Sequence, residues 1–437
     1  MICEVLFKAL MSWGTLRVYD ARGKLHEFAG APGPQVTFRL HDRSLHYKIF
    51  WNPRLAIGEA YMDGTLTIED GDQIIDLIDL MGANLTKLES TKVVKLRNWL
   101  TPLVRPIQQY NPVGRARKNV AHHYDLSDKL FDLFLDSDRQ YSCGYFETPN
   151  DSLEQAQLAK KHHLASKLLL DRPGLKMLDI GCGWGGLGIY MHQQAGAEVT
   201  GLTLSTEQHI YATEQAENLG ITDHVRFELR DYRLATGSYD RIVSVGMFEH
   251  VGFKYYSQFF NKLKNLLTED GVAVLHTIAR WDGPSVTNPW LRKYIFPGGY
   301  TPSLSEIFAA IEPTGLKVLD MEILRLHYAE TLKRWSRNFR ANRDKVKAIY
   351  DERFCRMWEF YLAGAETAFR RQDHMIAQLQ IAREQDAAPL TRDYLVDWKR
   401  AHPLSAPRRP ELSPLFKQNT PMILRLGTRG CIKTTAL

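Results

Sequence analysis

The sequence predicts an α/β protein in which a doubly wound parallel sheet follows a smaller N-terminal α+β domain. Beyond residue 119, apolar strand-like segments alternate with amphipathic helical segments, a pattern typical of parallel strands joined by crossover helices. A glycine-rich turn follows the first of these strands, at the edge where such a sheet binds its ligand. Shorter strands, interrupted by Gly and Pro, come earlier in the chain and predict a separate unit.

The bulk composition indicates a soluble protein of two domains. The chain has 437 residues, of which 44% are apolar and 24% charged, values that suit an ordinary globular enzyme. It lacks an unbroken apolar run of about 20 residues, the length that would span a membrane. The five cysteines form no Cys-x-x-Cys pair, so neither a disulfide framework nor structural zinc is expected. We expect a cytoplasmic protein without a cleaved leader.

Residues 1–85 are expected to form the small α+β domain. Thr15 to Tyr19 and Val36 to Leu40 alternate apolar and polar side chains, as half-buried strands do. Gly71 to Met81 instead carries apolar residues at helical spacing.

Residues 86–118 are expected to form a basic linker, with three prolines and Glu89 as its single acid. Such a segment attracts a polyanion, either a nucleic acid or an anionic lipid surface, or it serves as a solvated connector. Its basic residues are Lys87, Lys92, Lys95, Arg97, Arg105, Arg115, Arg117 and Lys118.

Residues 119–395 are expected to form the doubly wound domain. The stretches 151–170 and 328–384 are expected to be helical and to flank the ligand crevice. Residues 396–437 mix Pro, Arg and Lys with weak periodicity and are expected to be poorly ordered. The expected strands are Lys176 to Ile180, Glu198 to Leu202, Val225 to Leu229, Arg241 to Val245 and Gly271 to Thr277.

The turn after Asp179 predicts a cofactor site. Gly181, Gly183 and Gly185 let the backbone turn tightly and approach a ligand, which a Cβ would prevent. The helix that follows offers free N–H groups to an anionic group. A dinucleotide is one candidate ligand, and a turn used only for packing is the structural alternative.

The second strand distinguishes between the candidate cofactors. A dinucleotide site needs an acid at the end of this strand, whereas here Thr203 and Ser205 end it and Gln208 follows. Asp231, after the third strand, is suited to accept a hydrogen bond from an adenine amino group. This arrangement favours S-adenosylmethionine over nicotinamide or flavin dinucleotides.

Eight short segments match one family in order and spacing. They are His122 to Ser127, Tyr141 to Phe146, Leu178 to Gly185, Gly201 to Ser205, Phe248 to Gly252, Leu275 to Ile278, Ile295 to Gly299 and His327 to Leu332. Together they resemble the cyclopropane-fatty-acyl-phospholipid synthase family, which includes the mycolic acid cyclopropane synthases. The resemblance covers residue 119 to about residue 394, and the N-terminal module is similar to that of the bacterial phospholipid enzymes.

The resemblance implies a Rossmann-like class I methyltransferase. Its implied reaction transfers a methylene from S-adenosylmethionine to the cis double bond of an unsaturated acyl chain of a membrane phospholipid, forming a cyclopropane ring. Carried over motif by motif, the cofactor-binding residues are Tyr141, Ser142, Asp179, Gly181, Cys182, Gly183, Trp184, Gly185, Thr203, Leu204, Ser205, Gln208, Asp231 and Tyr232.

The resemblance also implies a bound bicarbonate that assists deprotonation of a carbocation. Glu249 would accept a hydrogen bond from the ion, His276 would donate or relay a proton, and Tyr328 would orient the ion. The implied catalytic residues are Cys143, Glu249, His276, Ile278 and Tyr328. No metal site is expected, because the histidine doublets lack Cys or acidic partners at ligand spacing.

The resemblance further implies a peripheral enzyme on the anionic inner membrane surface, without a nucleic-acid partner and with a homodimer as its implied assembly. A fatty-acid C-methyltransferase that makes a methyl or methylene branch remains an alternative, since its first step is identical. A non-catalytic lipid-binding protein and an RNA methyltransferase remain alternatives of other classes, although no RNA-binding module is recognisable.

Overall fold

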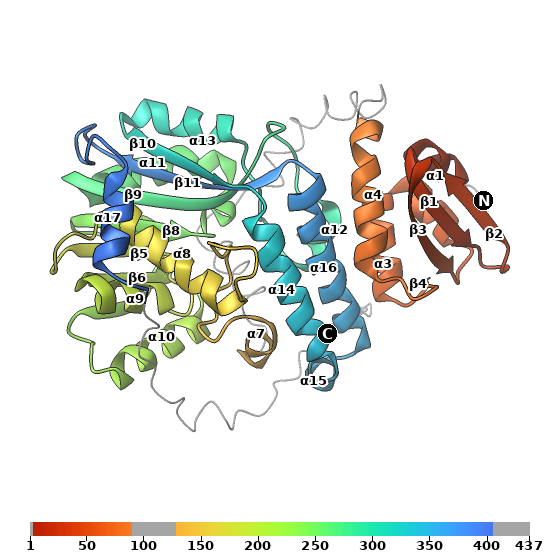
Figure 1. Ribbon diagram of the computed structural model, residues 1–437, viewed down its shortest axis with the longest axis horizontal. Coiled ribbons are helices and arrows are strands. Elements are labelled where there is room, and N and C mark those ends of the chain that lie inside the picture. Colours follow the sequence, from red (N-terminus) through yellow and green to blue (C-terminus); the bar gives the residue numbers. More distant parts are fainter. Residues whose placement is uncertain (1–2, 90–127, 405–437) are drawn as a thin grey trace, which may run out of the picture.

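The computed structural model describes residues 3–89 and 128–404. Most of the expected basic linker, the segment His122 to Ser127 and residues 405–437 therefore lie outside the described residues. The described part contains a four-stranded sheet and a seven-stranded sheet, each covered by helices (Figure 1). Within it, no helix combines the length and apolar character needed to cross a membrane.

The small domain is built on a mixed sheet of order β2-β1-β3-β4. Strands β1 and β3 contain the two segments predicted as strands, and α4 overlaps the predicted helix. Alternate side chains of β1, including Leu16 and Val18, are buried against the helices, which is why this strand reads as half-buried. The elements are α1 (Glu4–Leu10), β1 (Trp13–Tyr19), β2 (Leu25–Ala29), β3 (Ala31–Leu40), α2 (Leu45–Trp51), α3 (Pro53–Met62), β4 (Leu66–Ile68) and α4 (Ile74–Glu89).

The large sheet has the order β10-β11-β9-β8-β5-β6-β7. β5 to β9 are parallel, which confirms the predicted doubly wound α/β class. β11 is antiparallel to both β9 and β10, so it alone runs against the other strands. The strands are β5 (Lys176–Ile180), β6 (Glu198–Thr203), β7 (Val225–Leu229), β8 (Tyr239–Val245), β9 (Leu267–Arg280), β10 (Lys317–Leu324) and β11 (His374–Ala382).

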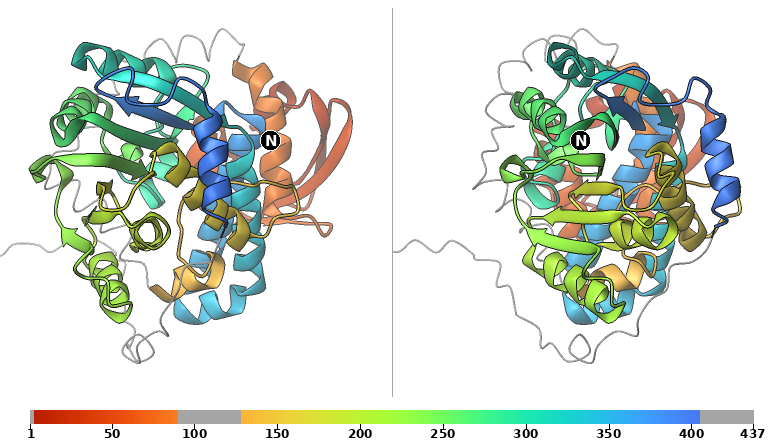
Figure 2. Two further views of the ribbon diagram at one scale, coloured as in Figure 1. Left: turned by 60° about the vertical axis from the view of Figure 1, so that its left-hand side comes forward. Right: turned by 90° about the vertical axis from the view of Figure 1, so that its left-hand side faces the viewer.

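Helices cover both faces of this sheet (Figures 1 and 2). The helices in this part of the chain are α7 (Asp128–Phe134), α8 (Leu153–Lys167), α9 (Gly186–Ala195), α10 (Thr206–Asn218), α11 (Tyr256–Leu266), α12 (Pro289–Tyr294), α13 (Leu304–Ile311), α14 (His327–Ala341), α15 (Arg343–Ile349), α16 (Glu352–Arg371) and α17 (Asp393–Ala401). Of these, α14 and α16 lie beside the sheet, between it and the small domain (Figure 1). Short 3₁₀ turns lie at Tyr232–Leu234, Phe248–His250, Phe253–Tyr255 and Glu312–Thr314.

The expectation that 328–384 is helical is wrong at its end, because residues His374–Ala382 form β11. This strand is buried on both faces, so its glutamines stand where a periodicity argument expects polar surface. Gln378 and Gln380 are completely or almost completely buried, and the Nε2 group of each donates a hydrogen bond within the protein. The Oε1 atom of Gln378 has no partner among the described residues. The strand β10 at Lys317–Leu324 was likewise not anticipated.

The expected boundary at residue 395 is also wrong, because it falls inside α17. Residues 396–401 are helical rather than poorly ordered, since Trp398 is buried and its indole N–H donates to Leu170 O at 2.8 Å. One aromatic anchor thus holds a polar segment against the domain.

The small domain packs on α16 and α12, on the far side of α14 and α16 from the large sheet (Figures 1 and 2). A Cβ at Gly82 of α4 would lie 2.4 Å from Cγ2 of Thr367 on α16, so only glycine permits this approach. Arg371 of α16 forms a bidentate pair with Asp79 of α4, at 3.0 and 2.9 Å. The two domains therefore share a closely packed interface.

Candidate active site

One pocket opens at the carboxyl ends of β5, β6, β7 and β8. β5 neighbours β6 on one side and β8 on the other, so the direction of strand order reverses at β5. Doubly wound sheets bind ligands at this reversal, because the loops on the two sides separate and leave a crevice. The position is that of a cofactor site.

The glycine turn shapes one wall of the pocket. Gly181 has φ +87°, and a Cβ there would lie 2.8 Å from the side chain of Met247. Gly183 has φ +55° and nothing within 4 Å of its would-be Cβ. Both the close packing and the positive φ therefore require glycine at position 181. At position 183 the positive φ favours glycine, and the space beside its Cα is open to a ligand.

Most of the residues expected to bind the cofactor line this pocket. Gly185 and Ser205 do not line it. Each is instead the N-cap of a helix, α9 and α10 respectively. Ser205 Oγ accepts the Gln208 backbone N–H at 3.3 Å. Those that line the pocket are Tyr141, Ser142, Asp179, Gly181, Cys182, Gly183, Trp184, Thr203, Leu204, Gln208, Asp231 and Tyr232.

The pocket wall also contains residues that were not predicted. Arg139 and Gln140 directly precede the predicted Tyr141, but nothing in their spacing marks them. Arg139 lies 4.8 Å from the Trp184 ring and its Nε donates to Asp132 at 2.6 Å. The other unpredicted lining residues are Ile180, Leu187, Leu202, Arg230, Arg233, Val245, Gly246, Met247, His250 and Val251.

Asp179 is a buried acid at the pocket. Its side chain is 1% exposed, and Oδ2 has no hydrogen-bond partner among the described residues. Burial raises the pKa of Asp179 to about 7, although Lys160 opposes part of this effect. A cationic or hydrogen-bonding group of a ligand would therefore find an unpaired acceptor here.

Ser142 is held by a buried lysine that sequence reasoning missed. Lys160 of α8 is fully buried, and its Nζ donates to Ser142 Oγ at 2.8 Å and to Gln140 Oε1 at 2.6 Å. Gln157 Nε2 donates to Ser142 O at 2.8 Å. These contacts fix the strand-like segment that lines the pocket. The many charged residues of α8 predict a solvent-exposed helix, so the sequence contains no signal for these buried contacts.

Asp231 is engaged by Arg233, two residues later. Its Oδ1 accepts from Nε at 2.8 Å and its Oδ2 accepts from an Nη at 2.6 Å. A carboxylate has further lone pairs, so this pair leaves acceptor capacity toward the pocket. Arg233 therefore fixes the orientation of the Asp231 carboxylate and of its remaining lone pairs.

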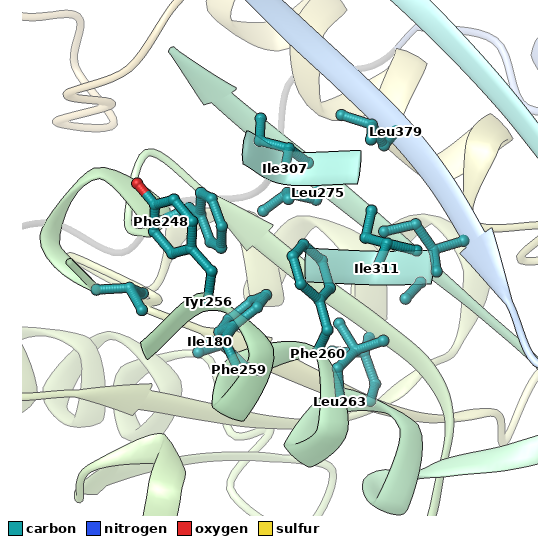
Figure 3. Packing of buried hydrophobic residues seen from close by; sticks show 14 of the residues in the cluster. Ile180, Phe248, Tyr256, Phe259, Phe260, Leu263, Leu275, Ile307, Ile311 and Leu379 are labelled. Atoms are coloured by element: carbon teal, nitrogen blue, oxygen red, sulfur yellow. The ribbon is translucent and has the colours of Figure 1, made fainter. Parts of the chain in front are cut away.

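Glu249 lies in the 3₁₀ turn Phe248–His250, and aromatic packing fixes that turn. Phe248 stacks on Tyr256 with ring centroids 4.2 Å apart and meets Phe259 edge-on at 5.1 Å (Figure 3). Glu249 Oε1 accepts the Ile278 backbone N–H at 2.5 Å. Burial raises the pKa of Glu249, and the Ile278 amide offsets part of that rise. The amide of Ile278, expected to face a bicarbonate, thus bonds to Glu249.

His276 is paired with Gln378 across β9 and β11, where the two are direct register partners. Gln378 Nε2 lies 3.0 Å from His276 Nδ1. Burial holds the pKa of His276 well below its ordinary range, so the ring is neutral. With Nδ1 accepting from the amide, the proton resides on Nε2. That atom has no partner among the described residues and so is a free donor.

Cys143 and Tyr328 lie in one buried cluster with Trp335. Cys143 is fully buried and its thiol donates to Gly144 O at 3.2 Å. Burial raises the pKa of this thiol, which excludes a thiolate nucleophile at neutral pH. The Tyr328 ring meets Trp335 edge-on at 5.8 Å and packs against Phe369 at 4.8 Å. Both residues belong to an aromatic wall.

The five expected catalytic residues do not line the cofactor pocket but adjoin it. Glu249 lies between Met247 and His250, which line the pocket, and Cys143 follows Ser142. The Gly246 amide donates to His276 O at 2.9 Å. The arrangement therefore places a buried acid and a neutral imidazole directly behind the cofactor pocket. In the described residues, no group of three His, Cys, Asp or Glu side chains is arranged to hold a metal.

Comparison with protein families gives a match to the mycolic acid cyclopropane synthetase family over residues 113–379. A protein of Pseudomonas putida, described as a probable fatty acid methyltransferase, is 35% identical over 364 residues, covering 82% of this chain and 88% of its own. The cyclopropane-fatty-acyl-phospholipid synthase of Escherichia coli strain K12 is 35% identical over 362 residues, covering 79% of this chain and 87% of its own.

A solved structure extends the similarity to the fold. The crystal structure of a mycolic acid cyclopropane synthase complexed with SAH and CTAB superposes with a TM-score of 0.58 at 34% identity. It covers 62% of this chain and 98% of that one.

Proposed function

Since the chain belongs to the mycolic acid cyclopropane synthetase family, we propose that it converts the cis double bond of an unsaturated phospholipid acyl chain into a cyclopropane ring. The methylene comes from S-adenosylmethionine. The observation that carries the proposal is the pair of unpartnered buried atoms, His276 Nε2 and Glu249 Oε2, behind the cofactor pocket. Burial of a polar atom without a hydrogen-bond partner costs free energy. We therefore infer that a polar group used in the reaction binds to these two atoms.

The pocket residues suit S-adenosylmethionine, whose sulfonium methyl is an electrophile. Asp179 would pair with the ammonium of its amino-acid portion, and the turn around Gly183 would receive that portion closely. Asp231, oriented by Arg233, would accept a hydrogen bond from the adenine amino group.

The buried atoms also fit bicarbonate, which would supply a small base for removing a proton in a dry pocket. His276 Nε2–H would donate to the ion and Glu249 would accept its hydroxyl proton. Cys143 and Tyr328 would border the ion, as the family resemblance implies. The Ile278 amide would act through Glu249, which it holds in place.

When bound, S-adenosylmethionine would supply an electrophilic methyl group. The π electrons of the alkene would form a bond to this methyl carbon while the carbon–sulfur bond breaks toward sulfur. The carbocation left on the chain needs an anhydrous aromatic environment. Tyr141 stacks on Trp335 with centroids 5.1 Å apart, and its hydroxyl bonds to that of Tyr361 at 2.8 Å. Loss of a proton from the new methyl group lets its carbon close the ring.

The test is incubation of the purified protein with S-adenosylmethionine and vesicles of an unsaturated phospholipid. We expect each modified chain to gain one CH₂ and lose its olefinic signal by NMR. The variant Glu249→Ala should bind the cofactor normally while its turnover falls by about 10²-fold or more, the usual contribution of proton transfer. Normal turnover of this variant would refute the role of Glu249.

A methyl- or methylene-branched product is the second candidate, favoured by the similarity to a probable fatty acid methyltransferase. The same incubation separates the two. An olefin retained at the modified carbons, or a saturated branch, would replace cyclopropanation with branching. Unchanged lipids would favour a non-catalytic lipid-binding protein.

We further propose that the protein acts peripherally at the cytoplasmic face of the inner membrane and forms a homodimer. Anionic phospholipids would attract its excess of basic residues, which gives a formal net charge of +6. Fractionation of cells at low and high salt tests the first statement. Sedimentation of the purified chain tests the second.

A further inference from the structure

Helix α2 carries two apolar stripes, and within the described residues only one of them packs into the core. Leu45 and Ile49 are 3% and 0% exposed and pack into the core of the small domain. Tyr47, Phe50 and Trp51 point the other way and are 57%, 36% and 80% exposed. Their spacing of three and four residues places them on one face. A surface helix normally presents polar side chains there.

The flanks of this aromatic face are basic. Residues 43–58 contain no Asp or Glu, while Arg43, Lys48 and Arg54 are all exposed. Cations beside Tyr and Trp are the combination found where helices lie in a membrane interface. The rings enter the boundary between headgroups and acyl chains, and the cations meet anionic headgroups.

The aromatic face is connected to the candidate active site through a short series of packed elements. Helix α3 follows α2 directly, and its Glu59 bonds to Lys293 and Tyr294 of α12, at 2.6 and 2.7 Å. Phe296, two residues beyond α12, packs on Tyr361 at 5.8 Å. Tyr361 in turn bonds to Tyr141 of the pocket. A lipid held at α2 would thus lie beside elements that lead to the site.

We propose that α2 docks the protein onto an anionic phospholipid surface. Tyr47, Phe50 and Trp51 enter the interface, and Arg43, Lys48 and Arg54 contact headgroups. A second copy of the chain is a poorer occupant for two reasons. Three partly exposed rings cover far less than the ~800 Å² per partner of a stable interface. The like charges on the two copies would also repel. The proposal rests on the proposed function in one respect, that the substrate is a membrane lipid.

The first test is co-sedimentation with vesicles of unsaturated phosphatidylglycerol and phosphatidylethanolamine. The combined variant Tyr47→Ser, Phe50→Ser and Trp51→Ser should bind about tenfold or more weakly, since most of the inserted apolar area is lost. The combined variant Arg43→Gln, Lys48→Gln and Arg54→Gln should bind vesicles more weakly, by about fivefold per cation at low salt and far less at high salt.

The matched control is the variant Ile210→Ser, Leu390→Ser and Val396→Ser, which removes three exposed apolar side chains elsewhere. It should bind vesicles like the wild type. Brominated lipids should quench emission of the wild type more than that of Trp51→Phe. Equal vesicle binding by the aromatic variant and the wild type would overturn the proposal.

Two further outcomes would also overturn it. One is a wild-type dimer that the aromatic variant dissociates, which would assign the face to a second copy. The other is a Trp51 already shielded from acrylamide without vesicles, which would assign it to the chain itself. Activity on detergent-dispersed unsaturated phospholipid separates this proposal from the proposed function. The aromatic variant should keep that activity and lose activity on vesicles, whereas a wild type inactive on both lipid forms contradicts the function alone.

Discussion

His276 illustrates how a neighbour decides what a catalytic side chain can do. Its neutral ring has two tautomers, and the amide of Gln378 at Nδ1 selects the one with its proton on Nε2. The unpartnered Nε2–H is then available as a donor rather than as an acceptor. The chemistry of the proposed base pocket therefore depends on a glutamine of a different strand.

Replacing Gln378 tests this dependence. In Gln378→Leu the ring can adopt either tautomer, and we expect turnover to fall by about 10²-fold while S-adenosylmethionine affinity stays unchanged. Gln378→Glu should be worse, because a carboxylate accepts from Nδ1–H and selects the wrong tautomer. Gln380→Leu, which loses a bond to Lys167 O instead, is the control and should lower stability more than turnover. Equal activity of the Leu and Glu variants would contradict the assignment.

Asp179 predicts a pH dependence of cofactor binding. Its carboxyl has a pKa of about 7 in the free protein, because it is buried. A ligand ammonium prefers the ionised form, whose population rises with pH. Affinity for S-adenosylmethionine should therefore increase from about pH 6 to about pH 8, as measured by calorimetry. Asp179→Asn should bind weakly at every pH in this range. Affinity that falls with rising pH would exclude the pairing.

Helix α17 shows how one aromatic residue orders a polar segment. Trp398 buries its ring and bonds to Leu170 O, although its neighbours are charged. We expect Trp398→Ala to lower the free energy of unfolding by about 3 kcal/mol, from the lost burial and hydrogen bond. Val396→Ala, at a 48% exposed position, should change it by less than about 0.5 kcal/mol. Urea unfolding measures both, and equal effects would mean that α17 is not anchored through Trp398.

Strand β11 is a second element whose burial depends on its neighbours in the fold. Gln378 and Gln380 alternate with apolar residues, a spacing typical of a strand rather than of a helix, so the helical expectation overlooked this pattern. The burial of β11 on both faces arises only because β9 and β10 flank it and helices cover it. The same strand supplies Gln378, so the misread element carries part of the proposed catalytic apparatus.

The whole molecule depends on close approach of α4 to α16. Gly82→Ala would place a Cβ 2.4 Å from the Thr367 methyl, and we expect it to destabilise the protein by about 1–3 kcal/mol. Adding Thr367→Ala removes that methyl, so the double variant should recover most of the loss. A double-mutant cycle by thermal unfolding measures the coupling. Additive effects would show that the two side chains do not meet.

Much of the architecture follows from local patterning. Apolar runs identified β5 to β9 to within a few residues, and the glycine turn located the pocket at their carboxyl ends. These features are readable because an apolar strand and a left-handed turn impose residue types at fixed spacing. The motif segments then supplied the family and the remaining candidate site residues, which local patterning alone would not distinguish from core.

The tertiary structure alone decided which polar side chains are buried and what they face. Lys160 behind Ser142, Gln378 behind His276 and the Ile278 amide on Glu249 all join residues far apart in the chain. A hydrogen bond or a pKa depends on distances and burial that exist only after folding, so residue types cannot specify it. The sequence therefore determined the sheet, the glycine turn and the candidate residues. The packed fold determined the tautomer of His276, the unpartnered buried atoms of His276 and Glu249, and the exposed aromatic face of α2.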